Sequence, residues 1–321
     1  MQRRALLGSV AALGLANRAQ AQENFPNRPI RLVVPNPPGG VSDVIARALG
    51  DRAAVHLGAQ VIVDNRPGGA TTIGSTFVAR SEPDGYTILT LTTAGLVQGV
   101  IQENLPFSFE RDFAPIIGVG SFPMALAVST ASNIRSMADL TAAARSRDGV
   151  TYGSGGAGTM SHLASVRLLN ELRGHGTHVP FRGNAPALQA LAGGHIQMMF
   201  PGVPEVPPVV AAGHIRVLAV TSDTRLPAIP DVPTMRELGF PEFNPRLWYA
   251  FVAPARTPAP IIARLHDAFA RALHEPAIQE RFTGLGFSTE LRGPEALAQY
   301  MRQETERWGT VVRANNLRST D

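Results

Sequence analysis

Three glycine-rich stretches carry the residue types from which an anion site could be built. They are "PGGVSD" (38–43), "PGGAT" (67–71) and "GSGGAGTMSH" (153–162). Each follows a short apolar run and precedes a segment with helical spacing of apolar residues. The first N–H groups of a helix lack intrahelical partners, and the helix dipole adds partial positive charge there. Because glycine has no Cβ, a carboxylate or phosphate can approach such a backbone closely.

A glycine-rich turn is also an ordinary connection between a strand and a helix, so no single one establishes a site. Two of the three form the first such junction of their half of the chain. Open α/β sheets bind ligands at the carboxyl ends of their strands. We therefore favour one shared anion site. None of the turns fits the dinucleotide fingerprint, and the phosphate-binding GxxxxGK[ST] loop requires a lysine, which the chain lacks.

The polar side chains at these turns each have a structural and a functional interpretation. Asp43 can cap its helix, or it can accept a hydrogen bond from a ligand ammonium or hydroxyl. His162 can be a buried structural histidine or a functional one, and Arg182 can lie on the surface or pair bidentately with a carboxylate. The same two roles are open for Ser42, Ser154 and Thr159.

Composition argues against several other functions. The 321 residues include no cysteine, and the formal net charge is only +4. No cluster of basic residues with interleaved aromatics indicates nucleic-acid binding. His175 and His178 are close in sequence, but no third ligand lies near them, so we expect no metal and no cofactor. No G-x-S-x-G elbow or other nucleophile motif is present, and we expect a binding protein rather than an enzyme.

The N-terminus has the organisation of a secretory signal peptide. Arg3 and Arg4 precede an apolar stretch over residues 5–16, and Ala19-Gln20-Ala21 forms a small-x-small cleavage site. We expect residues 1–21 to be removed, by the general secretory route rather than the twin-arginine route that the Arg pair could also mark.

Strand-like and helix-like segments alternate along the rest of the chain, which predicts an α/β fold of two lobes with largely parallel sheets. We expect the three C-terminal helices to pack back on the first lobe and to bring no strand of their own. Strands are expected at 30–35, 61–65, 83–91, 113–129, 178–181, 195–202, 215–222 and 248–254. Helices are expected from 42 and at 73–80, 137–145, 185–191, 204–212, 260–273, 276–285 and 294–315. Residues 150–170 are expected to form a strand, a glycine-rich turn and a helix in that order.

Six blocks in order resemble the Bug-type solute receptors, the substrate-binding components of tripartite tricarboxylate transporters. The blocks begin "RPIRLVVPNPPGGVSD", "VIVDNRPGGATTIGS", "VTYGSGGAGTMSHLAS", "VPFRGNAPALQALAGGHIQ", "GHIRVLAVTSDTRLPAIPDVPT" and "WYAFVAPARTPAP". The resemblance covers nearly all of the chain after residue 25. It implies a periplasmic, two-lobed type II binding protein, or Venus flytrap, that takes small organic carboxylates and acts with membrane permease subunits, and that is a monomer.

The resemblance also implies lobe limits and ligand contacts. Lobe 1 would comprise residues 22–122 and 253–321, and lobe 2 residues 123–252 with the crossover strands near 121–126 and 249–252. First-lobe contacts would be Pro38, Gly39, Gly40, Ser42, Asp43, Ala70, Thr71, Thr72, Thr92 and Thr93. Second-lobe contacts would be Ser154, Gly155, Gly158, Thr159, His162, Phe181, Arg182, Gly183, Asn184 and Ala185.

The chain departs from the family pattern at two places. Gln197 stands where the family usually has Asp, and Phe181 and Arg182 stand where Tyr and Lys are more frequent. Both changes put the identity of the carboxylate in doubt. Because a fold does not fix a function, two alternatives stay open: a sensor that presents its ligand-bound form to a signalling partner, such as a sensor kinase, and an enzyme acting on small acids with His162 in the site.

Overall fold

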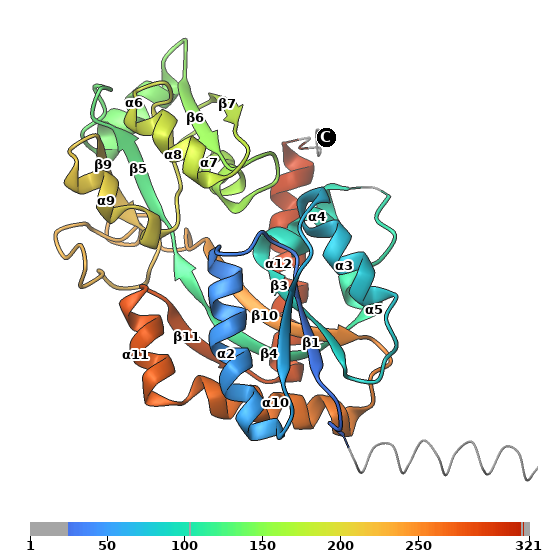
Figure 1. Ribbon diagram of the computed structural model, residues 1–321. Helices are drawn as coiled ribbons and strands as arrows, with labels where there is room; N and C mark the ends of the chain where they lie inside the picture. Colours follow the sequence, from blue (N-terminus) through green and yellow to red (C-terminus); the bar gives the residue numbers. More distant parts are fainter. Residues whose placement is uncertain (1–24, 103, 316, 318–321) are drawn as a thin grey trace, which may run out of the picture.

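The structure is a computed structural model and describes residues 25–102, 104–315 and 317. The predicted signal peptide, residues 1–21, lies outside the described residues. The chain forms two α/β lobes, each built around one β-sheet, and Figure 1 shows them one above the other. Within the described residues, no helix has the length and apolar character needed to cross a membrane.

The first lobe contains a six-stranded sheet in the order β11-β4-β10-β3-β1-β2. Strands β1, β2 and β3 run parallel, whereas β10, β4 and β11 join by antiparallel pairing. The strands are β1 (Ile30–Val34), β2 (Val61–Asn65), β3 (Thr87–Thr92), β4 (Phe113–Pro123), β10 (Arg246–Pro254) and β11 (Ser288–Arg292).

Both faces of the first sheet are covered, and β1 shows this directly. Because successive strand residues point to opposite faces, Ile30 and Leu32 enter one apolar core and Val33 enters another. Helices α2 and α10 cover the first face, and the first half of α12 covers the second. The helices of this lobe are α2 (Val41–Leu57), η1 (Gly69–Thr71), α3 (Thr72–Ala79), α4 (Thr93–Ile101), α5 (Phe109–Asp112), α10 (Ala259–Leu273), α11 (Pro276–Gly284) and α12 (Pro294–Ala314).

The second lobe contains a five-stranded sheet in the order β7-β6-β8-β5-β9. Strands β7, β6 and β8 are parallel, and β5 pairs antiparallel with both β8 and β9. The strands are β5 (Ala125–Ser129), β6 (Val150–Ser154), β7 (Gly176–Pro180), β8 (Met198–Met199) and β9 (Ile215–Val220). The helices are α6 (Met137–Arg145), α7 (Met160–Glu171), α8 (Asn184–Ala192), η2 (Val203–Glu205) and α9 (Pro207–Ala211).

The α/β, two-lobed fold class is confirmed, with corrections to its details. The sheets are mixed rather than largely parallel, because the strands that link the lobes enter them antiparallel. The run at residues 113–129 forms two strands in different sheets, β4 and β5, with Met124 between them. Strand β10, expected in the second lobe as a crossover strand, pairs along its length with β3 and β4 of the first sheet. The limits of the two lobes stay a prediction.

The C-terminal region differs from the expectation in two ways. It does contain a strand, β11, which pairs with β4. Helix α12 also does not remain on the first lobe. Its first half places Leu297 and Met301 in the first-lobe core, whereas Trp308 and Val312 join the core of the second lobe. A hydrogen bond of 3.2 Å from Asn170 on α7 to Asn315 fastens the end of the chain to the second lobe.

A buried carboxylate holds α12 in this position. Glu304 is 4% exposed, and its Oε2 accepts hydrogen bonds from the indole N–H groups of Trp248 (3.1 Å) and Trp308 (3.0 Å). Trp248 lies on β10 of the first sheet, and Trp308 lies in the second-lobe core. Glu304 therefore ties α12 to β10 of the first sheet and, within the helix, holds Trp308, whose ring packs in the second-lobe core.

We predict that Glu304→Leu lowers the free energy of unfolding by about 2–4 kcal/mol, because two buried indole N–H groups lose their acceptor. Urea denaturation of the mature chain measures this loss. Glu306→Leu on the exposed side of the same helix is the matched control and should change stability by less than about 0.5 kcal/mol. Equal effects of the two substitutions would contradict the assignment.

Candidate ligand-binding site

The turn at residues 38–43 is held by the carboxylate of Asp43. Asp43 Oδ2 accepts hydrogen bonds from the Gly39 amide (3.0 Å) and Arg47 Nε (3.0 Å), and Oδ1 accepts from Asn65 Nδ2 (2.9 Å) and contacts Arg47 Nη2 (2.9 Å). Gly39 has a φ of +81°, which favours glycine. These four contacts occupy the acceptor sites of the carboxylate. Asp43 thus holds the turn before α2 and does not cap the helix by a side-chain hydrogen bond, and its contact with a ligand stays a prediction.

The contacts of Asp43 also set its ionisation. Burial raises its pKa, but the hydrogen bonds from Arg47, Gly39 and Asn65 together outweigh burial and hold the pKa below the usual range. The N-cap residue of α2, Gly40, has no side chain to fill the space before the helix, and a Cβ built on it would meet only the Pro37 carbonyl oxygen, at 3.5 Å. The start of α2 is thus open to a ligand.

The turn at residues 154–159 repeats this arrangement in the second lobe. His162 Nδ1 accepts a hydrogen bond of 3.0 Å from the Gly158 amide, four residues earlier, as Asp43 does from Gly39. Gly158 also has a positive φ, +75°. Thr159 is the N-cap of α7, and its hydroxyl accepts a hydrogen bond from the His162 amide at 3.4 Å. The two helices that open the predicted site therefore begin in the same way.

His162 is buried in a stack of rings. It lies parallel to His178 with the ring centroids 3.8 Å apart, and Tyr152 stacks on His178. Burial, with a smaller contribution from His178, lowers the pKa of His162 to about 4. Burial also lowers the pKa of His178, whose Nε2 lies 2.7 Å from the Ser154 hydroxyl. Both imidazoles are neutral at pH 7, and among the described residues no His, Asp and Glu cluster forms a metal site.

The depressed pKa of His162 predicts a pH-dependent stability. Because its folded pKa, about 4, lies below the unfolded value of 6.5, unfolding takes up a proton as the pH falls below about 6.5, and stability declines through that window. The free energy of unfolding can change by up to about 1.4 kcal/mol per pH unit for one proton taken up. Unfolding free energies of the wild type and His162→Asn, measured from pH 7 to pH 5, should show a flatter profile for the variant. Parallel profiles would contradict this reading, and His274→Asn, at an exposed histidine, is the control.

The remaining first-lobe residues surround the start of α4. Thr92 is its N-cap and accepts from the Gly95 amide at 3.3 Å, and a Cβ on Gly95 would lie 3.3 Å from the Thr71 hydroxyl. Thr72 donates to the Gly69 carbonyl at 2.7 Å. Thr93 accepts from the Trp248 amide and donates to the Arg246 carbonyl, so its hydroxyl is engaged by β10. Ala70 lies in η1, between these turns.

The turn at residues 181–185 lies directly against the turn at 154–159. The Phe181 amide donates to the Ser154 carbonyl (3.0 Å), and the Gly183 amide donates to the Gly155 carbonyl (3.2 Å). Asn184, the first residue of α8, packs so closely on Gly155 that a Cβ there would be 2.6 Å from its Oδ1. Arg182 and Ala185 are exposed at this turn. The structure thus brings all the predicted second-lobe residues into one cluster.

The parallel register explains why the turns gather. Val34 and Asn65 are paired at the ends of β1 and β2, and Ser154 and Pro180 are paired at the ends of β6 and β7. The carboxyl ends of parallel strands share one edge of the sheet, so the turns that follow them converge. In Figure 1 the helix α2 begins at its upper end, on the side of the second lobe.

Gln197 does not face these turns. Its side-chain oxygen accepts a hydrogen bond of 2.8 Å from the Thr151 amide, near the opposite end of β6 from Ser154. The replacement of the usual Asp by Gln197 therefore removes a carboxylate at the edge of the second-lobe sheet, away from these turns.

Two residues beside the turns were not selected from the sequence, Tyr249 and Glu205. Burial raises the pKa of Tyr249, the negative charge of Glu205 raises it further, and the nearby Ser42 hydroxyl lowers it. Both Ser42 of the first lobe and Glu205 of the second thus affect the ionisation of Tyr249 on β10. The sequence does contain a feature that could have identified Glu205 as a candidate site residue. Glu205 is the only Asp, Glu or Arg between Arg182 and Arg216.

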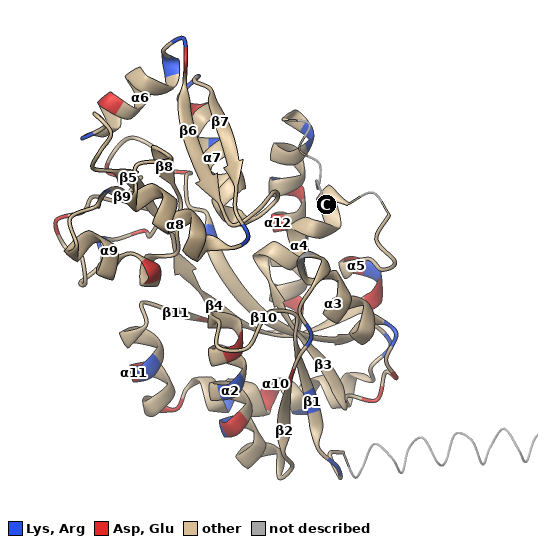
Figure 2. Cartoon of the chain, turned by 45° about the horizontal axis from the view of Figure 1, so that its top comes forward, with Lys and Arg blue, Asp and Glu red and all other residues tan. Residues whose placement is uncertain are grey.

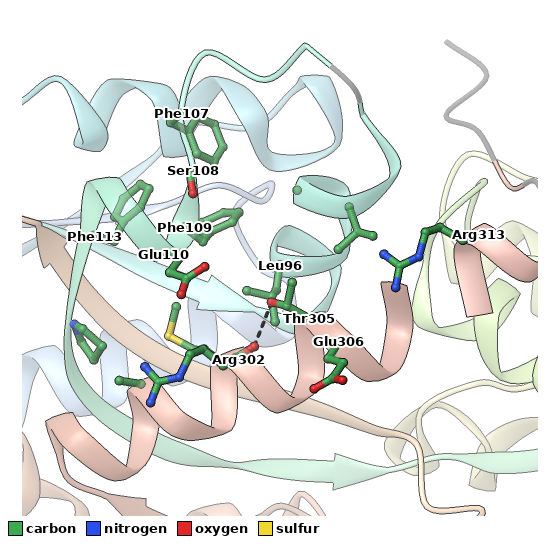
Figure 3. Close-up of a pocket in the computed structure, with 15 residues that line it drawn as sticks. Leu96, Phe107, Ser108, Phe109, Glu110, Phe113, Arg302, Thr305, Glu306 and Arg313 are labelled. Atoms are coloured by element: carbon green, nitrogen blue, oxygen red, sulfur yellow. Dashed lines mark hydrogen bonds between the residues drawn. The ribbon is translucent and has the colours of Figure 1, made fainter. Parts of the chain in front are cut away.

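A separate cavity of about 440 Å³ lies between α4, α5 and α12 (Figure 3). Phe107, Phe109 and Phe113 form one side of it, while Arg302 and Arg313 project from α12. None of the predicted ligand residues lines this cavity. Basic and acidic residues are interspersed over the helices and loops of both lobes in Figure 2.

A two-lobed α/β molecule with paired helix-start turns has the architecture of a periplasmic binding protein. Comparison with family models matches residues 45–317 to the tripartite tricarboxylate transporter family receptor, TctC. The chain belongs to this family, whose members are binding proteins and not enzymes, and this confirms the resemblance to Bug-type receptors.

The chain is similar along nearly its whole length to several relatives. It is 38% identical to the UPF0065 protein in the tcbD-tcbE intergenic region of Pseudomonas sp. strain P51, over 97% of this chain and 94% of that protein. It is 33% identical to protein BugT of Bordetella pertussis, over 95% and 94%.

Two solved structures from Rhodopseudomonas palustris share the fold. Rpa4515 with adipate has a TM-score of 0.81 and 30% identity, covering 92% of this chain and 99% of that one. MatC with bound malate has a TM-score of 0.78 and 31% identity, covering 90% and 100%.

Proposed function

We propose that this chain is a periplasmic solute receptor that binds a small organic carboxylate between its lobes and delivers it to the permease of a tripartite tricarboxylate-type transporter. The observation that carries the proposal is the pair of turns at the starts of α2 and α7, each folded by the same glycine-to-side-chain hydrogen bond. Two similar proteins hold dicarboxylates, malate and adipate.

The ligand carboxylate would be gripped by backbone N–H groups and hydroxyls rather than by a buried cation. The first N–H groups of α2 and α7 carry partial positive charge and have no intrahelical partner. The contact residues would be those predicted from the sequence, with Asp43 and His162 shaping the turns rather than touching the ligand. The lobes would close over the ligand by bending at the links between the two sheets.

Residues 1–21 would direct export by the general secretory route, and the mature chain would act as a monomer in the periplasm. Docking of the closed, ligand-bound form on the permease would complete delivery.

Gly40→Leu provides a direct test of the binding site. Gly40 is exposed and has a φ of −75°, so a larger side chain fits without backbone strain and would cover the start of α2. We expect affinity for the carboxylate to fall at least tenfold, while melting curves of the unliganded variant show that it stays folded. Gly284→Leu at the end of α11, where a Cβ meets nothing within 4 Å, is the control.

A thermal-shift screen of mono-, di- and tricarboxylates and their matched amides would identify the ligand, and titration calorimetry would then measure its affinity. A ligand at about 100 times its Kd stabilises the folded state by about 2.7 kcal/mol, which a melting curve resolves. Stabilisation by amides equal to that by acids, or undiminished binding to Gly40→Leu, would refute the proposed site.

A further inference from the structure

Glu205 is a carboxylate with incomplete local partners. Its Oε2 accepts from the Gly202 amide at 3.3 Å, and both oxygens lie 3.4 Å from Asn184 Nδ2. All three contacts are long for hydrogen bonds to a charged acceptor, which are usually 2.7–2.9 Å. Four acceptor sites are thus served by two weak donors.

No positive charge compensates Glu205. It is half-buried, and none of the ion pairs formed by the described residues includes it. Burial accordingly raises its pKa, against the smaller lowering by Asn184 and Gly202. A carboxylate so placed gains most from a donor or cation brought by another molecule.

Glu205 lies next to the second-lobe turn to which the proposed function assigns the ligand. Asn184 connects it to Gly155 of the second-lobe turn. On the other side, Glu205 acts electrostatically on Tyr249, which neighbours Ser42 at the start of α2. Its short helix η2 begins at the link between the lobes, since Gly202 forms a β-bridge with Met124, and a Cβ on Gly202 would lie 3.2 Å from the Leu247 side chain. Glu205 therefore lies beside the second-lobe turn, next to the link between the lobes.

An unpaired carboxylate at this place discriminates between ligands by charge. A dicarboxylate seated on the turns would bring its second negative charge toward Glu205, and like charges repel most strongly where water is scarce. An ammonium or another N–H donor at the same position would instead form the charge-assisted hydrogen bond that Glu205 lacks.

We propose that Glu205 is a specificity-determining residue that selects a ligand with one carboxylate and, at its other end, a cationic or hydrogen-bond-donating nitrogen. This inference rests on the proposed function, because the ligand carboxylate is placed on the turns. The ligand class it predicts differs from the malate and adipate held by two similar proteins.

The test compares ligands that differ only at the far end. Three pairs serve as probes: succinate with 4-aminobutanoate, adipate with 6-aminohexanoate, and terephthalate with 4-(aminomethyl)benzoate. Titration calorimetry on the mature chain at pH 7.5 should give at least tenfold tighter binding for the amino member of the pair that fits. Glu205→Gln should reduce that preference at least tenfold, by weakening the amino member and strengthening the diacid.

Two further variants control for folding and surface charge. Glu205→Ala should also abolish the preference, and melting curves of the unliganded variants show that each is folded. Glu280→Gln removes an exposed carboxylate on α11 and should leave the preference as in the wild type.

The outcomes separate this inference from the proposed function. If the wild type binds the diacid of a pair more tightly than the amino member, the inference is overturned and the receptor function still stands. A protonated Glu205 that donates to the second carboxylate would produce this result. The same conclusion holds if both members bind and Glu205→Gln leaves their ratio unchanged. Failure of every carboxylate, in these pairs and in the wider screen, overturns the receptor function and the inference with it.

Discussion

One hydrogen bond, made twice, shapes the candidate site. In each lobe a glycine amide in a left-handed conformation donates to a side chain four residues later, Gly39 to Asp43 and Gly158 to His162. The bond folds the chain back over the first turn of the helix and uses the amide of the loop rather than those of the helix. In α7 the Thr159 hydroxyl already accepts from the His162 amide, and the other N–H groups at the two helix starts lack intrahelical partners and can donate to an anion.

The two acceptors, Asp43 and His162, differ chemically, but neither leaves an unbalanced charge at its turn. The charge of Asp43 is balanced by Arg47, and His162 is kept neutral by burial. Neither turn therefore adds a net charge of its own to the partial positive charge of its helix dipole. Glu205 stands out against this background as an ionisable group with no balancing partner among the described residues.

Local features of the fold could be predicted from the sequence, whereas long-range ones could not. Apolar runs that end in proline and glycine correctly marked β1, β6 and the turns after them, because strand, turn and helix are encoded within about 20 neighbouring residues. Strand β11, with the polar sequence "STELR", shows no apolar alternation and exists because β4 offers it an edge. Expected strand 195–202 contracts to Met198–Met199, since its pairings with β5 and β6 extend over only two residues. The proximity of Tyr249 to Glu205 depends on how two sheets meet, which no local pattern records.

Helix α12 forms a third connection between the lobes, besides the chain segments that link β4 to β5 and β9 to β10. Two neighbouring links alone would let one lobe both rock and twist on the other. A stiff rod that is rooted in one lobe, ends in the other and is tied midway by Glu304 resists torsion. The closure proposed for ligand binding would then be a rocking about one axis, which would bring the turns before α2 and α7 together in a single alignment.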